Sequence, residues 1–436
     1  MLADVVAPNI RVCFVAHGAT MEGACRYLLD QADYLLRKQF GVFAIVPTDG
    51  PLRAALMSRG VPVEIVPSRW WTRNYFPTSP PDFGAAVKTA RRIAAIVHEW
   101  SVDVVYTHTV VAPAGPLGAA LAGVPHIWHL HEFAYNPTGI RMAIAQPEFA
   151  RLLDVTSNRV YFNSVAVAAE WANMLPAEKT RLVYNWTSPV VDDALPDTED
   201  EVALKLLRDE SVFVVAIVGS VHRWKRQSDA IAAVANLLSE GRNVALLIVG
   251  PSAEPAYVAE LTETVALREL TQRVRFLGYT EFPQRVMRAA NVTLVCSDKE
   301  PFGRVTIESM AQGTPVIGAD SGGTSEIIEH DVDGMLFPTG DVPALTERLR
   351  TLIADRDLQR RLAAALQRSR KFQDADVAMQ PVLDDLAALA GKQNPTWPFG
   401  SVINDGLATL FSAEISTQPS ASIIRKALRK LVRREK

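Results

Sequence analysis

Short apolar runs, each bounded by glycine, proline or polar residues, recur along this chain and predict buried strands. In the first half these runs are residues 10–16, 43–47, 63–67, 102–109, 125–133, 159–164 and 181–185. In the second half they are residues 213–219, 245–250, 274–278, 292–296 and 316–319. Segments of helical spacing lie between several of the runs, as in residues 23–38, 115–122 and 304–312. This alternation predicts an α/β fold with doubly wound, parallel sheets.

The chain is too long for one core. At 436 residues it exceeds what one hydrophobic core usually supports, so we expect two domains. Residues 186–200 are rich in proline and acidic residues and poor in large apolar ones, which is typical of a linker. We therefore predict one domain over residues 1–188 and a second over 189–373. Beyond residue 341, helical spacing returns over residues 343–366 and 377–389.

Composition is ordinary for a globular protein. Apolar residues make up 48% of the chain, charged residues 21%, and the net charge is −3. No run approaches the length of a membrane span, and the first ten residues lack the basic start and apolar core of a signal peptide. The three cysteines have no metal-ligand spacing, which fits small buried residues in a reducing compartment. We expect a cytoplasmic protein.

Two carboxylates and two glycine-rich loops gather between residues 292 and 341. Glu300 lies in the loop after one predicted strand, and Glu308 lies one to two turns into the helix that follows. Phe302-Gly303 and Gly322-Gly323 precede predicted helices, where backbone N–H groups and the helix dipole favour an anion such as phosphate. A phosphate site flanked by carboxylates suits a nucleotide sugar.

A cluster of cations follows the first strand of the second domain. The segment FVVAIVGSVHRWKRQ places His222, Arg223, Lys225 and Arg226 just after Gly219. Cations at the carboxyl end of a strand would stabilise a departing diphosphate. The alternative is a solvated helix start.

The stretch around Glu300 resembles glycosyltransferase family 4, which comprises retaining enzymes of the B-type glycosyltransferase fold. The family's pattern of Glu, seven residues, Glu stands here as Glu300 and Glu308 within EPFG, and SGGTSEIIEHDVDGMLFP follows in the family's register. The resemblance implies two Rossmann-like domains facing across a cleft, an acceptor side in residues 1–188 and a nucleotide-sugar site in residues 189–373. It also implies a helix over residues 374–390 that crosses back to the first domain.

The resemblance further assigns roles to individual residues. Glu308 would hold the ribose hydroxyls, Glu300 the donor sugar, and Lys225 with Arg223 the diphosphate, together with the N–H groups after Phe302. Further donor-binding positions implied in this way are Gly23, Gly219, Gly303 and Arg304. Two positions depart from the family pattern: Ser220 stands where an arginine is expected, and Gly23 is followed by Ala24 rather than a second glycine.

Two histidines end the predicted strand over residues 125–133. His129 and His131 are two residues apart, so both should point to the same face of the strand while Glu132 points away. Their spacing is compatible with metal binding, but no third ligand at a convincing spacing accompanies them, and we expect no metal site. The resemblance instead matches His131 to a histidine that contacts the transferred sugar, leaving His129 as a packed structural residue. It implies no metal and no other cofactor.

Two segments could contact an acceptor or a membrane. Residues 69–76, RWWTRNYF, either stack on an acceptor or a membrane interface or pack over their own domain. Residues 391–421 form a predicted linker to a tail, 422–436, with an apolar stripe and seven Lys and Arg against one acid. The tail carries +6, which leaves −9 on the rest of the chain. It either binds an anionic membrane surface or docks on a protein.

Taken together, these features predict a retaining glycosyltransferase that moves a hexose from a nucleoside diphosphate sugar (UDP- or GDP-sugar) to a glycan or lipid-linked acceptor, in cell-surface polysaccharide synthesis. No nucleic-acid partner is indicated. A non-catalytic nucleotide-sugar-binding or assembly protein of the same fold remains an alternative, which Ser220 favours. A sugar-nucleotide epimerase and a phosphorylase also share the fold, but the first gives no reason for the tail and the second needs a cofactor lysine that we cannot identify.

Overall fold

The computed structural model describes residues 10–72, 83–135, 140–187, 194, 196–368 and 372–392. The chain forms two compact units. Unit 1 comprises Met1–Asn163, Ala168–Val183 and Met379–Lys436, and unit 2 comprises Ser164–Val167 and Tyr184–Ala378. The boundary predicted after residue 188 lies a few residues beyond the passage of the chain into unit 2.

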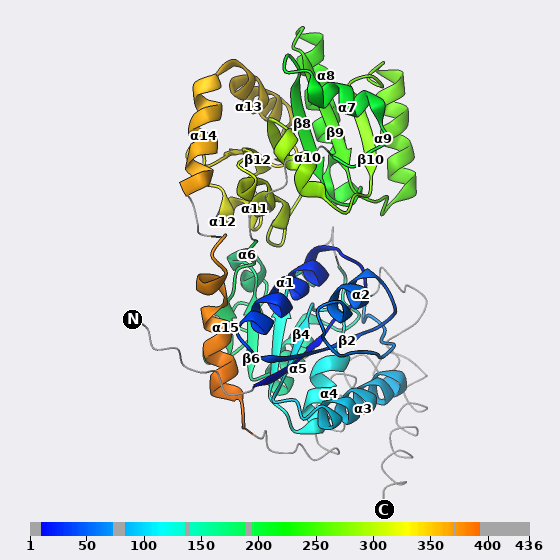
Figure 1. The fold of residues 1–436 in the computed structure, drawn as a ribbon, viewed down its shortest axis with the longest axis vertical. Helices are drawn as coiled ribbons and strands as arrows, with labels where there is room; N and C mark the ends of the chain where they lie inside the picture. Colours follow the sequence, from blue (N-terminus) through cyan, green and yellow to red (C-terminus); the bar gives the residue numbers. More distant parts are fainter. Residues whose placement is uncertain are drawn as a thin grey trace, which may run out of the picture. The chain divides into compact units, whose positions relative to one another are not determined.

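Unit 1 is built on a sheet of seven parallel strands in the order β3-β2-β1-β4-β5-β6-β7, with helices on its faces (Figure 1). Its strands are β1 (Arg11–Val15), β2 (Gly41–Val46), β3 (Val63–Ile65), β4 (Val104–His108), β5 (His126–Leu130), β6 (Arg159–Phe162) and β7 (Thr180–Leu182). Its helices are α1 (Gly23–Arg37), α2 (Pro51–Met57), α3 (Phe83–Glu99), α4 (Ala114–Ala122), α5 (Gln146–Thr156) and the 3-10 turn η1 (Ala177–Lys179). The short helix α6 (Val165–Ala169) begins in unit 2 and ends in unit 1.

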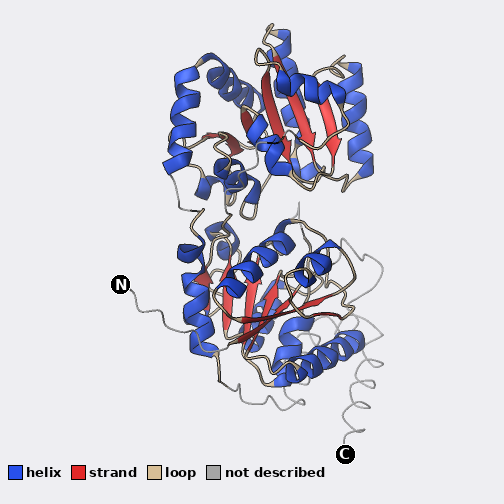
Figure 2. Cartoon of the chain, viewed as in Figure 1, coloured by secondary structure: helices blue, strands red, loops and turns tan. Residues whose placement is uncertain are grey.

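Unit 2 repeats this plan with six parallel strands in the order β10-β9-β8-β11-β12-β13 (Figure 2). The strands are β8 (Phe213–Val218), β9 (Val244–Val249), β10 (Val274–Gly278), β11 (Val292–Val295), β12 (Val316–Ala319) and β13 (Met335–Phe337). The helices are α7 (Glu201–Arg208), η2 (Arg223–Lys225), α8 (Gln227–Ser239), α9 (Pro255–Leu267), α10 (Pro283–Ala289), α11 (Arg304–Ala311), α12 (Thr324–Ile327), α13 (Val342–Ala354) and α14 (Arg356–Arg368). The last helix, α15 (Ala375–Leu389), begins in unit 2 and ends in unit 1.

The central strands are buried on both faces, which is why they appear in the sequence as continuous apolar runs. Every residue of β4, β5, β9, β11 and β12 is buried. The strand order reverses direction between β1 and β4 in unit 1 and between β8 and β11 in unit 2. In open parallel sheets, ligands bind beside the carboxyl ends of the strands at such a reversal. The predicted α/β class with two Rossmann-like sheets is confirmed.

Two details of unit 2 differ from the prediction. The segment predicted as one helix over residues 343–366 forms two helices, because Asp355 has extended backbone and its carboxylate caps the next helix at Leu358 N (2.8 Å). Strand β13 was not predicted. The predicted linker 391–421 lies outside the described residues apart from its first two, and the tail 422–436 lies wholly outside them. No helix of the described part is long and apolar enough to span a membrane.

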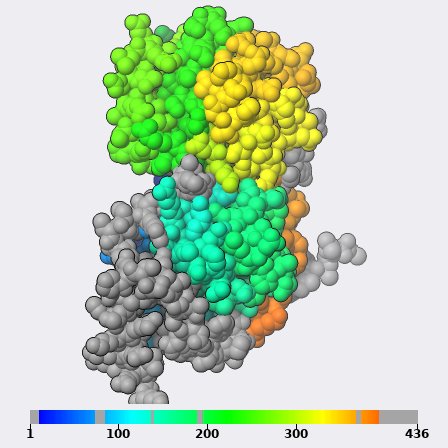
Figure 3. All heavy atoms as spheres, turned by 180° about the vertical axis from the view of Figure 1, so that it is seen from behind, coloured from blue at the N-terminus to red at the C-terminus, as the bar shows by residue number. Residues whose placement is uncertain are grey.

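Helix α15 packs on the sheet of unit 1 through a buried carboxylate. Asp385 accepts hydrogen bonds from Arg159 Nε at 2.6 Å and from the Tyr161 hydroxyl at 2.9 Å, both on β6. Arg181 Nε on β7 lies 3.8 Å away. Figure 3 shows α15, in orange, against the green residues of this edge. The ion pair fixes where the helix lies along the strands.

Candidate functional site

The loops after β8 and β11 meet at the point where the strand order of unit 2 reverses. Lys225 Nζ lies 2.7 Å from Glu300 Oε2, and the same oxygen accepts a hydrogen bond from the Ser297 hydroxyl at 2.7 Å. The side chains of Lys225 and Glu300 are 16% and 12% exposed. A largely buried lysine and a carboxylate thus share the crevice where a parallel sheet binds its ligand.

Glycines allow the loop that carries Glu300 to lie this close to its neighbour. Gly322 has φ +59, and a Cβ there would lie 2.1 Å from the Glu300 carbonyl oxygen. Gly323 N donates to that carbonyl at 2.8 Å. Gly303, with φ +102, is the N-cap residue that precedes α11. No other residue type fits at Gly322, so this glycine allows the loop to hold Glu300 in place. The binding of an anion by the backbone N–H groups of these loops stays a prediction.

Glu308 lies on α11, where it pairs with the first residue of the same helix. Its Oε1 is 3.1 Å from Arg304 Nε and 3.0 Å from Arg304 Nη2. Both side chains are largely buried, at 17% and 11% exposed. The side chain of Phe302 is buried among Tyr184 and Phe372, so it belongs to the core and only its backbone is placed at the start of α11.

The predicted cations after β8 separate into two groups. Lys225 reaches Glu300, and Gly219, with φ +135, lies beside it: a Cβ there would be 3.9 Å from Lys225 Cε. Arg223 instead pairs with Glu254 at 3.0 Å and Glu260 at 2.5 Å. The role of Arg223 at a diphosphate stays a prediction, and these acids compete for it.

One residue near Glu300, Ser297, was not among the candidate residues predicted from the sequence. Ser297 lies two residues after the end of β11, and its hydroxyl group orients Glu300 by a hydrogen bond. Arg226 has φ +53 and bridges Asp229 at 2.7 Å and Asp298 at 2.9 Å, which joins the loop after β8 to the loop after β11. The position of Ser297 just after a strand, three residues before Glu300, was the available signal.

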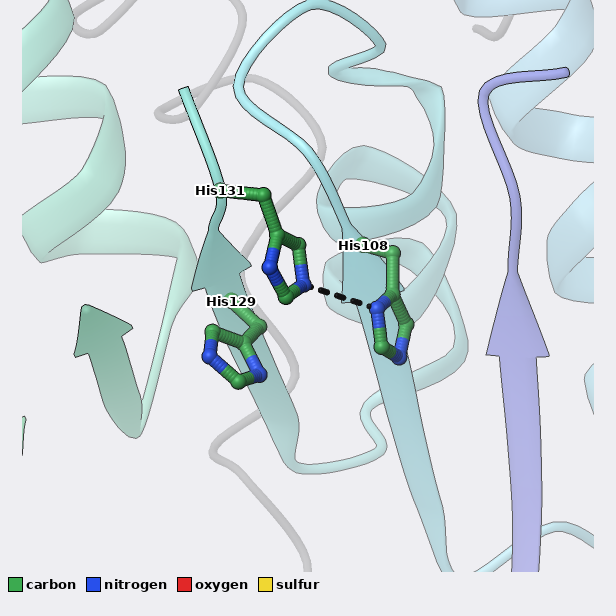
Figure 4. Close-up of side chains that lie close together, drawn as sticks. All are labelled: His108, His129 and His131. Atoms are coloured by element: carbon green, nitrogen blue, oxygen red, sulfur yellow. Dashed lines mark hydrogen bonds between the residues drawn. The ribbon is translucent and has the colours of Figure 1, made fainter. Parts of the chain in front are cut away.

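In unit 1, three histidines meet at the ends of β4 and β5 (Figure 4). His129 and His131 lie on one face of β5 with ring centroids 4.1 Å apart, as their spacing predicted. His108, the last residue of β4, stacks on His131 and its Nδ1 lies 2.9 Å from His131 Nε2. Burial holds the pKa of His108 well below its usual range and lowers that of His129 to about 3, so both rings are neutral. His108 was not predicted as a partner of these histidines, because it lies on the neighbouring strand and far from them in the sequence.

The other predicted residues of unit 1 lie at the same end of the sheet. Gly23 begins α1 with φ +38. Glu132 is buried, which raises the pKa of its carboxyl group, and it accepts hydrogen bonds from the backbone N–H groups of Val110 and His131 at 3.1 and 3.3 Å. Trp71 is buried and Trp70 donates its indole N–H to the His17 carbonyl at 2.9 Å. The described part of the 69–76 segment therefore packs over its own unit, and residues 73–76 lie outside the described residues.

Comparisons with known proteins agree across both units. Residues 21–189 match the family model described as Glycosyltransferase Family 4, and residues 199–368 match that of Glycosyl transferases group 1. The chain is 29% identical over 189 residues to N-acetyl-alpha-D-glucosaminyl L-malate synthase of Bacillus anthracis, a match covering 43% of this chain and 48% of that protein. It is 34% identical over 187 residues to D-inositol 3-phosphate glycosyltransferase of Jonesia denitrificans, covering 42% and 43%. The match thus spans about half the length of these curated relatives.

Solved structures show the same fold. The Anabaena protein HepE in complex with UDP and glucose superposes with a TM-score of 0.71 at 23% identity, covering 87% of this chain and all of HepE. A glycosyltransferase from Rickettsia africae gives a TM-score of 0.72 at 18% identity, covering 88% and 99%. At these identities the likeness establishes the fold alone.

Proposed function

The chain belongs to glycosyltransferase family 4, and on that premise we propose that it is a retaining glycosyltransferase. It moves a hexose from a UDP- or GDP-sugar to a hydroxyl of a glycan or lipid-linked saccharide, in the cytoplasm and as a step of cell-surface polysaccharide synthesis. The observation that carries this proposal is the Lys225–Glu300 pair at the strand reversal of unit 2, with Glu308 on the helix that follows. HepE, a protein of the same fold, was crystallised with UDP-glucose, which supports a nucleotide-sugar donor.

Each residue has a task in this proposal. Lys225 neutralises the charge that develops on the diphosphate as the glycosidic bond breaks, Glu300 binds the donor sugar, and Glu308 binds the ribose hydroxyls. Both acids are paired with cations in the structure, so the donor exchanges these pairs for its own phosphate and hydroxyl groups. His131 is the proposed contact of unit 1 to the transferred sugar.

The donor can be identified by thermal stabilisation of the full chain. A ligand at a hundred times its dissociation constant stabilises a protein by about 2.7 kcal/mol. Screening UDP- and GDP-sugars should therefore give one that raises the melting temperature clearly above the others. Absence of stabilisation by every nucleoside diphosphate sugar would argue against the proposed site.

Replacing Glu308 with alanine should weaken donor binding and transfer together, about 10- to 100-fold, because hydrogen bonds to a charged group contribute about 1.5–3 kcal/mol. Calorimetry with UDP or GDP measures the affinity directly. Glu263→Ala removes an exposed acid of α9 in the same unit and is the matched control, expected to bind as the wild type does. Equal nucleotide affinity in Glu308→Ala and wild type would remove Glu308 from the site.

We also propose that transfer needs no metal cofactor, since Lys225 supplies the positive charge that a metal ion gives the diphosphate in other enzymes. Protein treated with EDTA should transfer at no less than the untreated rate, and adding Mg²⁺ or Mn²⁺ should change that rate less than about twofold. A loss of activity with EDTA that Mg²⁺ or Mn²⁺ restores would contradict this part of the proposal.

The tail supports a proposed attachment to an anionic membrane surface. Attraction near such a surface is worth about 1 kcal/mol per basic residue and falls off within a Debye length. The full chain should co-sediment with anionic vesicles in a salt-sensitive way and hardly at all with neutral ones. Removing residues 422–436 should abolish this binding and leave transfer to a soluble acceptor nearly unchanged. Equal binding by the shortened chain would show that the stripe packs on a protein instead.

One observation favours the alternative of a non-catalytic nucleotide-sugar-binding protein: a serine stands at position 220, where an arginine is expected. In the structure the Ser220 carbonyl accepts a hydrogen bond from Gln227, and its short side chain cannot replace a guanidinium. A binding protein of this kind would be stabilised by the donor and release no nucleotide.

A further inference from the structure

The three histidines of unit 1 form a compact set of nitrogen donors outside the proposed donor residues of unit 2. His108 and His129 are opposite each other on the paired strands β4 and β5, and His131 follows on the same face. One ring nitrogen from each lies within 4.8 Å of the others, and all three residues are buried. His108 Nδ1 and His131 Nε2 are 2.9 Å apart. Two ligands on a tetrahedral zinc ion are separated by roughly 3.3 Å, given bonds of about 2.0 Å.

The hydrogen bond between the His108 and His131 rings does not satisfy all the ring nitrogens of this cluster. Two neutral imidazoles share a single proton in one hydrogen bond, whichever ring donates it. His108 Nε2 is then either a buried donor or a buried acceptor, and among the described residues it has no hydrogen-bond partner. An unmatched buried polar atom of this kind calls for an explanation, and a bound ion is one of the recognised ones.

Neighbouring residues hold the histidine rings in place by hydrogen bonds, as is common around metal ligands. The Tyr106 hydroxyl lies 2.9 Å from His129 Nδ1 and accepts a hydrogen bond from Gln31 Nε2 at 3.2 Å, which fixes the orientation of the His129 ring. The buried carboxyl group of Glu132 accepts a hydrogen bond from the backbone N–H of His131 at 3.3 Å, which helps to fix the backbone that carries this ring.

We propose that His108, His129 and His131 form a binding site for one late first-row transition-metal ion, with Zn²⁺ the best match. Imidazole nitrogen suits zinc, cobalt, nickel and copper, whereas magnesium and calcium require oxygen ligands that this set does not provide. A metal ion bound to His131 would engage the ring that is proposed to contact the sugar. Metal binding should therefore inhibit transfer. This fits a reaction that needs no metal.

The test is metal binding by the full chain, stripped with a chelator and incubated with Co²⁺ or Zn²⁺ before desalting. Elemental analysis should find one ion per chain, and Co²⁺ should give the visible absorption of a tetrahedral nitrogen site. His129→Phe should weaken binding at least 100-fold. Tyr106→Phe, which removes only the hydroxyl that orients His129, should weaken it about 10- to 100-fold. His98→Gln, an exposed histidine of α3, is the control and should bind as the wild type does.

The circular dichroism of each variant shows whether it is folded. If His129→Phe is not folded, the metal affinity of Tyr106→Phe tests the proposal. The proposal is overturned if the wild type retains no ion, or if the folded variants bind as tightly as it does. In either case the histidines are a hydrogen-bonded structural cluster. Because the measurement does not use transfer, its failure would leave the proposed glycosyltransferase activity untouched.

Discussion

Replacing Lys225 with alanine should slow transfer about 100- to 1,000-fold while changing donor affinity much less, which is the effect of removing one donor that stabilises a developing negative charge. The lysine is largely buried and lies 2.7 Å from Glu300, so its charge acts in a site where water screens little. Its attraction to the diphosphate grows as the glycosidic bond breaks, and an interaction stronger in the transition state appears in kcat.

Steady-state kinetics with the identified donor, together with calorimetry, separates the two effects. Lys225→Arg keeps the charge and should lose less activity than Lys225→Ala. Arg223→Ala is an informative comparison. Because Arg223 is paired with Glu254 and Glu260, this variant should lose little transfer activity. A change confined to KM in Lys225→Ala would contradict the role, and an equally large loss in Arg223→Ala would restore the sequence-based assignment of both cations.

Replacing Asp385 with alanine should free α15 from unit 1 and destabilise its attachment by about 3 kcal/mol, since two charge-assisted hydrogen bonds are lost together. The carboxylate is 8% exposed and is bonded to Arg159 and Tyr161. Hydrogen exchange followed by mass spectrometry should show faster exchange of the α15 amides, roughly 100-fold for that energy. Asp384→Ala removes the neighbouring, exposed carboxylate and is the matched control. Unchanged protection of α15 in Asp385→Ala would show that apolar packing alone holds the helix.

The sheets were predictable because their strands are buried on both sides. The run at residues 245–250 is typical of a strand covered on both faces, and β9 is buried along its whole length. The break at Asp355 was not predicted because the helical spacing resumes directly after it.

The position of a candidate site residue was predictable where the local sequence determines it. It was less predictable where contacts between distant segments determine it. Glu300 and Glu308 belong to one loop and helix, so their spacing fixes them. The sequence contains nothing that distinguishes Arg223 from Lys225 as the partner of Glu300. That choice depends on α9, whose acids Glu254 and Glu260 lie beside Arg223 only in the folded unit. His108 likewise meets His131 through strand pairing, not through proximity in sequence.

The proposed function requires that this chain break the bond between a sugar and a nucleoside diphosphate at Lys225 and Glu300. The most direct measurement is the release of UDP or GDP from nucleotide sugars by the purified full chain, with and without saccharide acceptors. We predict release by the wild type at least 100 times faster than by Lys225→Ala. The contradicting result is that, with every donor and acceptor tried, the wild type releases nucleotide no faster than Lys225→Ala does. That result would favour a nucleotide-sugar-binding protein without catalytic activity.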